Sequence, residues 1–281
     1  MAGPSNVARR LAEVTLSVVM PAYNEEATLA AAVRRVRACG LRTEIVVVDD
    51  ASTDGTRAVL ESLREAGLVD RVVLHERNQG KGAAVRSAIP HVPGDLVVIQ
   101  DADLEYDPAD LPALMQPIVD GRADAVLGSR FLGGPHRVLY FWHRVGNGFL
   151  TLFSNMLTNL NLTDMETCYK VVRSDLMKSL PLRSRRFGIE PELVARLAQS
   201  GARIYEVPIS YSGRTYAEGK KIGWRDGVAA FGHVLRYNLL PPRAPAYRPA
   251  RTGAAGAAHA VPAVAVSPVM EEAGMARLHT H

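Results

Sequence analysis

The sequence predicts an α/β protein whose central, mostly parallel sheet is flanked by helices. Short apolar runs rich in β-branched residues alternate with stretches in which apolar residues recur at helical spacing, a pattern typical of parallel sheets. The most informative run, residues 96–101, ends in an acidic residue, and open α/β sheets bind ligands beyond the carboxyl ends of their strands. A chain of 281 residues is long enough to bury one large core.

The first half of the chain shows this alternation most clearly. The predicted strands, each a short apolar run, are residues 16–20, 44–49, 71–75, 96–101 and 125–128. The predicted helices between them are residues 27–38, 56–65 and 81–88, with a further helix that begins near Pro108. Gly40 and Gly67 follow the first two helices, at positions where glycine commonly ends a helix. Together these elements describe a repeated strand-helix-strand path through one sheet.

The second half is less regular and ends in a segment of different composition. Its predicted elements are helices at residues 140–160, 190–199 and 223–238 and a strand at 203–207 that is stopped by Pro208. From residue 241 onward Ala, Pro, Gly and Val follow one another without periodicity, which predicts a disordered, flexible tail. We therefore expect an N-terminal extension (1–14), one α/β domain (15–240) and a tail (241–281).

Composition and charge argue against several classes of protein. The formal charge is +4 and the pI is near 9.2, but the basic residues are dispersed, so no nucleic-acid partner is predicted. Cys39 and Cys168 are too few for a disulfide scaffold, which favours a reducing, cytoplasmic location. The first 14 residues lack the apolar core of a signal peptide. The sequence contains no run of 18 apolar residues, so no membrane-spanning helix is predicted.

Asp101 and Asp103 follow the fourth predicted strand and flank one small residue. Two carboxylates brought together are costly unless a cation joins them, and Mg²⁺ or Mn²⁺ prefers such oxygen ligands. Such a metal usually completes its shell with water and substrate phosphates, so a nucleotide diphosphate is implied. Glu105 continues the spacing and is either a third ligand or a solvated side chain. The alternative for the pair itself is a solvated turn at the strand end.

The loops after the first three strands carry further candidates. Pro21-Ala22-Tyr23-Asn24-Glu25-Glu26 places polar groups where a nucleotide base or ribose would lie, although Asn24 could instead cap a helix. Asp49 and Asp50 could accept hydrogen bonds from a base or a ribose. No Gly-x-Gly-x-x-Gly follows the first strand, which argues against a dinucleotide site. Lys81, in Asn78-Gln79-Gly80-Lys81-Gly82, suits a phosphate or base contact or belongs to a plain loop.

The second half supplies arginines and carboxylates. Arg130 follows the fifth strand and suits bidentate phosphate binding. The polar loop 212–221, with Arg214, Lys220 and Lys221, could close on a diphosphate or be a solvated charged loop. The carboxylates that could bind acceptor hydroxyls, act as bases or simply cap helices and form ion pairs are Asp164, Glu166, Glu190 and Glu192.

Taken together, these motifs resemble family 2 glycosyltransferases of the GT-A fold, a Rossmann-like α/β fold. Within that family the chain is most similar to dolichyl-phosphate mannose synthases and related polyprenyl-phosphate sugar synthases. The segments that carry the resemblance, within residues 15–238, are Val18–Glu26, Val48–Thr56, Asn78–Gly82, Asp101–Glu105 and Gly128–Phe131. In this order they are highly specific for the family.

The resemblance implies a role for each candidate. The implied nucleotide and diphosphate residues are Pro21, Tyr23, Glu25, Asp49 or Asp50, Lys81, Asp101 and Lys220, and the implied metal ligands are Asp101, Asp103 and Glu105. The implied catalytic residues are Asp103, Arg130, which would meet the acceptor phosphate, and Arg214, which would hold the donor diphosphate. Acceptor candidates beside Arg130 are Arg144, Asp164, Glu166 and Glu190. The segment Asp164–Lys170 is more acidic than is usual in this branch.

The implied activity is a metal-dependent, inverting transfer of a hexose from a nucleotide-diphosphate sugar, of the GDP-mannose or UDP-glucose type, to a polyprenyl or dolichyl phosphate. One alternative is a soluble enzyme acting on a hydroxyl of a small metabolite or cell-envelope precursor, with Glu166 or Asp164 as base. Another is a catalytically inactive nucleotide-sugar-binding protein. Aromatic and basic residues in 140–160 and 223–238 suit helices lying on the cytoplasmic face of a membrane, or else these aromatics are core.

Overall fold

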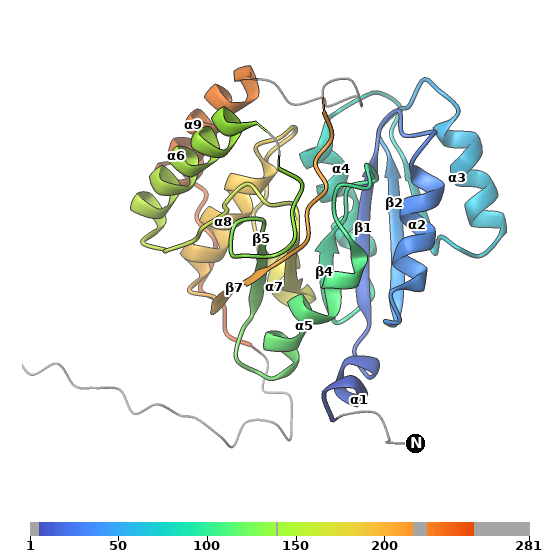
Figure 1. The fold of residues 1–281 in the computed structure, drawn as a ribbon, viewed down its shortest axis with the longest axis horizontal. Coiled ribbons are helices and arrows are strands. Elements are labelled where there is room, and N and C mark those ends of the chain that lie inside the picture. The colour runs from blue at the N-terminus through green and yellow to red at the C-terminus, as the bar shows by residue number, and fades with distance from the viewer. Residues whose placement is uncertain (1–5, 139, 216–223, 250–281) are drawn as a thin grey trace, which may run out of the picture. The chain divides into compact units, whose positions relative to one another are not determined.

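The computed structural model of the protein describes residues 6–138, 140–215 and 224–249 (Figure 1). In these residues seven strands form one sheet in the order β3-β2-β1-β4-β6-β5-β7. The strands are β1 (Leu16–Ala22), β2 (Thr43–Asp49), β3 (Arg71–Leu74), β4 (Leu96–Ile99), β5 (Ala125–Ser129), β6 (Lys170–Arg173) and β7 (Ile204–Pro208). The predicted α/β class with a mostly parallel sheet is confirmed.

Helices cover the sheet and extend beyond one end of it. They are α1 (Asn6–Ala12), α2 (Leu29–Ala38), α3 (Thr56–Glu65), α4 (Lys81–Ala88), α5 (Leu111–Val119), α6 (Phe141–Thr158), α7 (Ser174–Ser179), α8 (Ile189–Ser200) and α9 (Trp224–Leu239). Short 3-10 turns, Ile89–His91 and Pro108–Asp110, follow α4 and precede α5. Figure 1 shows α2 and α3 at one side of the molecule and α6 and α9 at the other. The predicted helices of the described residues are present, with ends shifted by a few residues.

The parallel half of the sheet forms because its strands are continuous apolar runs. β1 pairs in parallel with β2 on one side and with β4 on the other, and β2 pairs with β3. Every residue of β4 is buried, as expected for a strand covered on both faces. Pro21 lies within β1, beyond the last residue that pairs with β4, where a missing N–H removes no bond to that strand.

The sequence did not predict β6, which runs antiparallel between β4 and β5. Its sequence, Lys-Val-Val-Arg, is only four residues long and follows a segment that we expected to be a turn. Its hydrogen-bonding partners lie about 45 to 75 residues earlier, so no local pattern marks it. The short helices α1 and α7 also went unpredicted.

Residues 241–249, expected to begin the tail, contact α7 and α8. The amide of Ala244 donates to Gln199 Oε1 at 3.1 Å, and that of Tyr247 donates to the Ser200 carbonyl at 2.8 Å. The Tyr247 hydroxyl also contacts both carboxylate oxygens of Asp175 at 3.0 Å. The packed part of the chain therefore extends past the predicted boundary at residue 240, and the rest of the expected tail lies outside the described residues.

None of the helices described here is both long enough and apolar enough to cross a membrane.

Candidate active site

The loops after β1 and β2 are tied to each other. Asn24 Oδ1 accepts a hydrogen bond from the Thr53 amide at 2.9 Å, and Ser52 Oγ accepts one from the Asn24 amide at 3.0 Å. Asn24 does not cap α2, because that helix begins at Leu29 with Thr28 as its N-cap. The alternative that Asn24 is a helix cap is therefore wrong. The tie fixes the position of the neighbouring Tyr23, whose side chain is partly exposed.

Backbone strain gathers at the same loops. The described non-glycine residues with positive φ are Asn24 (54°), Ala51 (61°), Leu104 (64°) and Asn159 (55°). The first three lie in the loops after β1, β2 and β4. For Ala and Leu this backbone region is costly and persists only where the surrounding structure holds it, a situation common at functional sites. Leu104 makes the turn that separates Asp103 from Glu105.

Asp49 and Asp50, the predicted nucleotide contacts, are both buried and differ in their partners. Asp49 accepts a hydrogen bond from Arg57 Nε at 2.6 Å. Asp50 Oδ1 lies 2.6 Å from His75 Nδ1, and its carboxylate accepts the amides of Gln79 and Gly80 at 2.9 and 2.6 Å. Asp50 therefore holds the loop that leads into α4. We assign it a structural role in this loop, which in turn places Lys81 at the start of the helix.

Lys81 lies between a candidate metal ligand, Asp101, and an acceptor candidate, Glu190. Its ammonium lies 2.8 Å from Asp101 Oδ2, 2.8 Å from Glu190 Oε1 and 3.5 Å from the Cys168 sulfur. Burial opposes its charge, but Asp101, Cys168 and Glu190 hold the pKa of Lys81 well above its usual value. Lys81 therefore lies between two carboxylates at the start of α4, and both of them favour its charged form.

Asp103 and Glu105 share a second cation, Arg214. Arg214 Nη2 lies 2.9 Å from Asp103 Oδ2, and its Nε lies 3.2 Å from Glu105 Oε1. The Tyr211 hydroxyl donates to the other oxygen of Glu105 at 2.7 Å. Burial, followed by the negative charges of Asp101 and Glu105, raises the pKa of Asp103 to about 7, against the opposing effect of Arg214.

The carboxylates after β4 thus lie close enough to repel one another, and each is engaged by a side chain. Among the described residues no three His, Cys, Asp or Glu side chains are arranged as a ready-made metal site. Asp101 and Asp103 still offer two hard oxygen donors next to arginine and lysine cations that suit phosphates. This donor set fits a Mg²⁺ or Mn²⁺ ion that takes its remaining ligands from water and a substrate diphosphate.

Arg130 and Asp164 form the next group. Arg130 Nε and Nη2 contact the two oxygens of the buried Asp164 carboxylate at 2.6 and 2.7 Å. The guanidinium also lies over the Tyr211 ring, 5.1 Å from its centre. Burial raises the pKa of Asp164, but Arg130 outweighs this effect and the pKa is lower than usual. Asp164 therefore orients Arg130 and is unsuited to act as a base.

Other acceptor candidates lie around this pair. Arg144 stacks on Phe131, with its guanidinium carbon 3.8 Å from the ring centre. Glu166 lies in the turn that Asp164 begins, and one of its oxygens is buried without a hydrogen-bond partner in the described chain. Lys220 and Lys221 lie outside the described residues, so the structure places Arg214 alone of the three basic residues of that loop.

Sequence reasoning missed two residues of the site and one of its supports. Tyr211 contacts Glu105 and packs against Arg130, and its place three residues before Arg214 was the available signal. Cys168 lies against Lys81. Glu206, on β7, accepts the amides of Thr163 and Asp164 at 3.0 Å and so fixes the turn that presents Asp164. Nothing in the local sequence marks Glu206.

Comparisons with known proteins identify the family of this chain and its fold. A sequence model of the family described as "Glycosyl transferase family 2" matches residues 17–180. The undecaprenyl-phosphate mannosyltransferase of Micrococcus luteus is 31% identical over 235 residues, which cover 79% of this chain and 93% of the relative. The hexosyltransferase Agl6 of Haloferax volcanii is 32% identical over 219 residues, or 75% of this chain. The alignment spans only about half (52%) of Agl6.

A solved structure shows the same fold. Glucosyl-3-phosphoglycerate synthase from Mycobacterium tuberculosis, in complex with Mn²⁺, UDP and glucosyl-3-phosphoglycerate, superposes with a TM-score of 0.64. The match covers 86% of this chain and 87% of the synthase, with 22% sequence identity. The fold is thus of the GT-A type. Because the family model spans more than half of the sequence, this chain belongs to glycosyl transferase family 2.

Proposed function

We propose that this glycosyltransferase moves a hexose from a nucleotide-diphosphate sugar to a polyprenyl phosphate, with inversion at the anomeric carbon. The observation that carries the proposal is the meeting of Asp103 and Arg214 at 2.9 Å, which sets a carboxylate beside a cation at the sheet edge. One suits a metal ion and the other a diphosphate. The proposed acceptor class is supported by the relative from Micrococcus luteus, which is named an undecaprenyl-phosphate mannosyltransferase.

The donor side is assigned from the loops after β1, β2 and β4. Pro21, Tyr23, Glu25 and Asp49 would line the nucleotide. Asp101 and Asp103 would hold the Mg²⁺ or Mn²⁺ ion, and Glu105, held by Tyr211, would orient Arg214. The ion, when bound, would supply positive charge that stabilises the departing diphosphate. Arg214, with Lys220, would contribute side-chain charge to the same leaving group.

The acceptor side is assigned to Arg130 and its neighbours. A phosphate monoester is largely dianionic at neutral pH, with a second pKa of about 6, so its oxygen is already a nucleophile. Arg130, fixed by Asp164, would position that oxygen in line with the bond to be broken. The oxygen lone pair forms the bond to the anomeric carbon while the carbon–oxygen bond to the diphosphate breaks, and its electron pair leaves with the diphosphate. One displacement of this kind inverts the centre.

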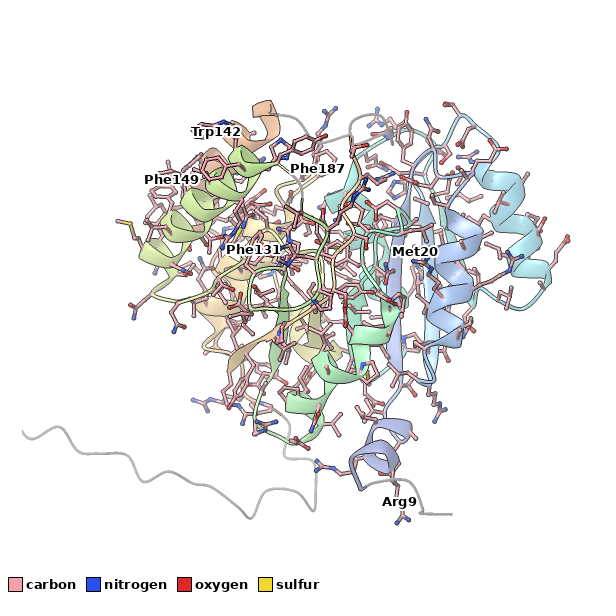
Figure 2. All side chains as sticks on the ribbon, viewed as in Figure 1. Arg9, Met20, Phe131, Trp142, Phe149 and Phe187 are labelled. Carbon is pink, nitrogen blue, oxygen red and sulfur yellow. The ribbon has the colours of Figure 1, made fainter. Side chains whose placement is uncertain are left out.

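A polyprenyl acceptor also needs a route to the membrane, and α6 offers a surface for it. Apolar side chains that recur on one side of this helix are strongly exposed: Trp142 (76%), Phe149 (62%), Leu152 (57%) and Met156 (73%). Figure 2 shows Trp142 and Phe149 on the side of α6 that points away from the rest of the protein. The helix carries Arg144 and no acidic residue. We propose that this side lies on the anionic, cytoplasmic face of a membrane.

A substrate screen tests the proposal. The protein is incubated with UDP-glucose or GDP-mannose, Mn²⁺ or Mg²⁺ and a prenyl phosphate, and products are read by mass. We expect a prenyl-phosphate hexose from one donor and none after EDTA treatment. Transfer only to hydroxyl acceptors would replace the proposal with a soluble-acceptor enzyme. Donor binding with neither transfer nor donor hydrolysis would indicate a nucleotide-sugar-binding protein instead.

A further inference from the structure

Glu166 is an acceptor candidate to which the contacts described above assign no role. Its Oε1 is buried, and no hydrogen-bond partner for it exists in the described part of the chain. The hydroxyl of the next residue, Thr167, is buried and unpartnered in the same way. Buried polar atoms almost always have partners, so an orphaned carboxylate oxygen calls for an explanation such as a bound ligand, ion or water molecule.

The charged groups that face Glu166 come from several parts of the fold. They are Glu190 on α8, Lys170 on β6, Arg130 after β5 and Asp164 in its own turn. Glu190 is paired with Lys81, and Asp164 is paired with Arg130. The ammonium of the buried Lys170 donates to the Thr167 carbonyl. Each of these neighbours therefore has a partner of its own, and none of them satisfies Glu166 Oε1.

These surroundings favour the neutral form of the Glu166 carboxyl group. Burial raises the pKa of Glu166 most, and Glu190 adds to the rise, while Lys170 and Arg130 oppose it; the result is a pKa of about 7. A phosphate acceptor held at Arg130 would add a further negative charge nearby and would raise this pKa again. A carboxylate in that position would repel the acceptor, whereas a protonated carboxyl group can donate a hydrogen bond to it.

We propose that Glu166 is an acceptor-binding residue that acts in its protonated form, its carboxyl O–H donating a hydrogen bond to an oxygen of the acceptor phosphate. Binding of the acceptor then takes up one proton from solution when Glu166 is ionised beforehand. The proton stays on Glu166 during sugar transfer, because the phosphate dianion needs no base. This inference rests on the phosphate acceptor of the proposed function and adds a pH-dependent determinant of acceptor affinity.

The test uses farnesyl phosphate as a soluble probe. Its binding to the full chain is measured by calorimetry at pH 8 in two buffers of different ionisation enthalpy, which reports the protons taken up. We expect wild-type protein to take up close to one proton. Its dissociation constant for the probe should rise by about 15-fold between pH 7 and pH 8.5, as ionisation of a group with pKa about 7 requires when only the protonated form binds.

Two variants sharpen the test. Glu166→Gln is neutral and keeps an N–H donor, so we expect binding of the probe without proton uptake and with a dissociation constant that does not change with pH. Glu65→Gln, an exposed change at the end of α3, should behave as wild type does. Loss of transfer in Glu166→Gln at every pH, in a protein that still unfolds cooperatively, would make Glu166 a base and overturn the proposal.

The wild-type measurement also separates two kinds of failure. If farnesyl phosphate does not bind at all, the phosphate-acceptor function itself is wrong. If it binds and is glycosylated but no proton is taken up, the function stands and the inference about Glu166 is wrong.

Discussion

Arg130 and Asp164 form a bidentate ion pair, with Arg130 Nε 2.6 Å from Asp164 Oδ2 and Arg130 Nη2 2.7 Å from Asp164 Oδ1. The Asp164 side chain is fully buried, and most of the Arg130 side chain is shielded from solvent. An arginine held along one edge in this way is a fixed cation, so its position depends on its planar fork as much as on its charge.

Replacing Arg130 with lysine should therefore impair catalysis more than donor binding. Lysine keeps the charge but lacks the planar guanidinium group with its two parallel N–H donors. We therefore expect turnover on a prenyl phosphate to fall on the order of tenfold or more while donor affinity changes little. Steady-state kinetics and donor calorimetry measure the two effects. Arg64→Lys, in an exposed ion pair on α3, is the matched control. A defect confined to nucleotide affinity would move Arg130 out of the acceptor site.

Asp103→Asn should abolish most of the metal-dependent activity without unfolding the protein. The change removes one hard oxygen donor and one of the charges that repel each other at the end of β4, so we expect a loss on the order of 100-fold with little change in the melting temperature. Asp107→Asn is the control, because asparagine can keep its contact with the Ala109 amide. Equal donor affinity with and without EDTA would contradict the metal assignment.

The parallel half of the fold could be predicted because each of its strands is marked by its own sequence. β1, β2 and β4 are short apolar runs, and the helix between β3 and β4 was placed at Lys81–Ala88, as the structure has it. β6 could not be predicted in the same way. Its four residues become a strand only because β4 and β5, distant in the chain, leave a place between them.

In the candidate site, too, features marked by the local sequence could be predicted, and contacts between distant parts of the chain could not. The acidic residues after β4 follow directly from the strand before them, and so their position at the sheet edge was predictable. Their partners were not, because Lys81 reaches Asp101 from α4 and Tyr211 reaches Glu105 from beyond β7. Asp50 shows the converse, since a carboxylate at the expected edge turns inward to hold the amides of Gln79 and Gly80.

The exposed side of α6 should bind anionic membranes. We expect full-length protein to sediment with phosphatidylglycerol vesicles at low salt and to be released as salt rises, since the attraction is partly electrostatic. The double change Trp142→Ala and Phe149→Ala removes two of the large exposed aromatics of α6 and should abolish sedimentation with little loss of stability. Leu74→Ala, an exposed apolar change on β3, should have no effect. Wild-type protein that stays in solution at low salt would refute the membrane assignment.

Glu166→Gln should stabilise the protein, but only at neutral and alkaline pH. In the folded protein, burial and Glu190 raise the pKa of Glu166 to about 7. The favourable contribution of protonated Glu166 to the free energy of unfolding is therefore fully present in acid, and it is lost as the pH rises toward and past 7. Glutamine stays neutral, and the variant should gain up to about 3 kcal/mol over wild type at pH 8 and nothing near pH 4. Urea unfolding at both pH values measures the difference. An equal gain at both would show that packing, not ionisation, is responsible.

The last prediction separates residues 241–249 from those that follow. A chain that ends at Pro249 keeps the contacts of Ala244 and Tyr247 with Gln199, Ser200 and Asp175, so it should fold and react with donor as the full chain does. A chain that ends at residue 240 loses these contacts and exposes part of α8, so its free energy of unfolding should fall by about 1 to 3 kcal/mol. Thermal and urea unfolding of both truncated chains provide the comparison. Equal stability of the two would show that the segment after α9 contributes nothing to the fold, and instability of both would show that residues beyond 249 support it.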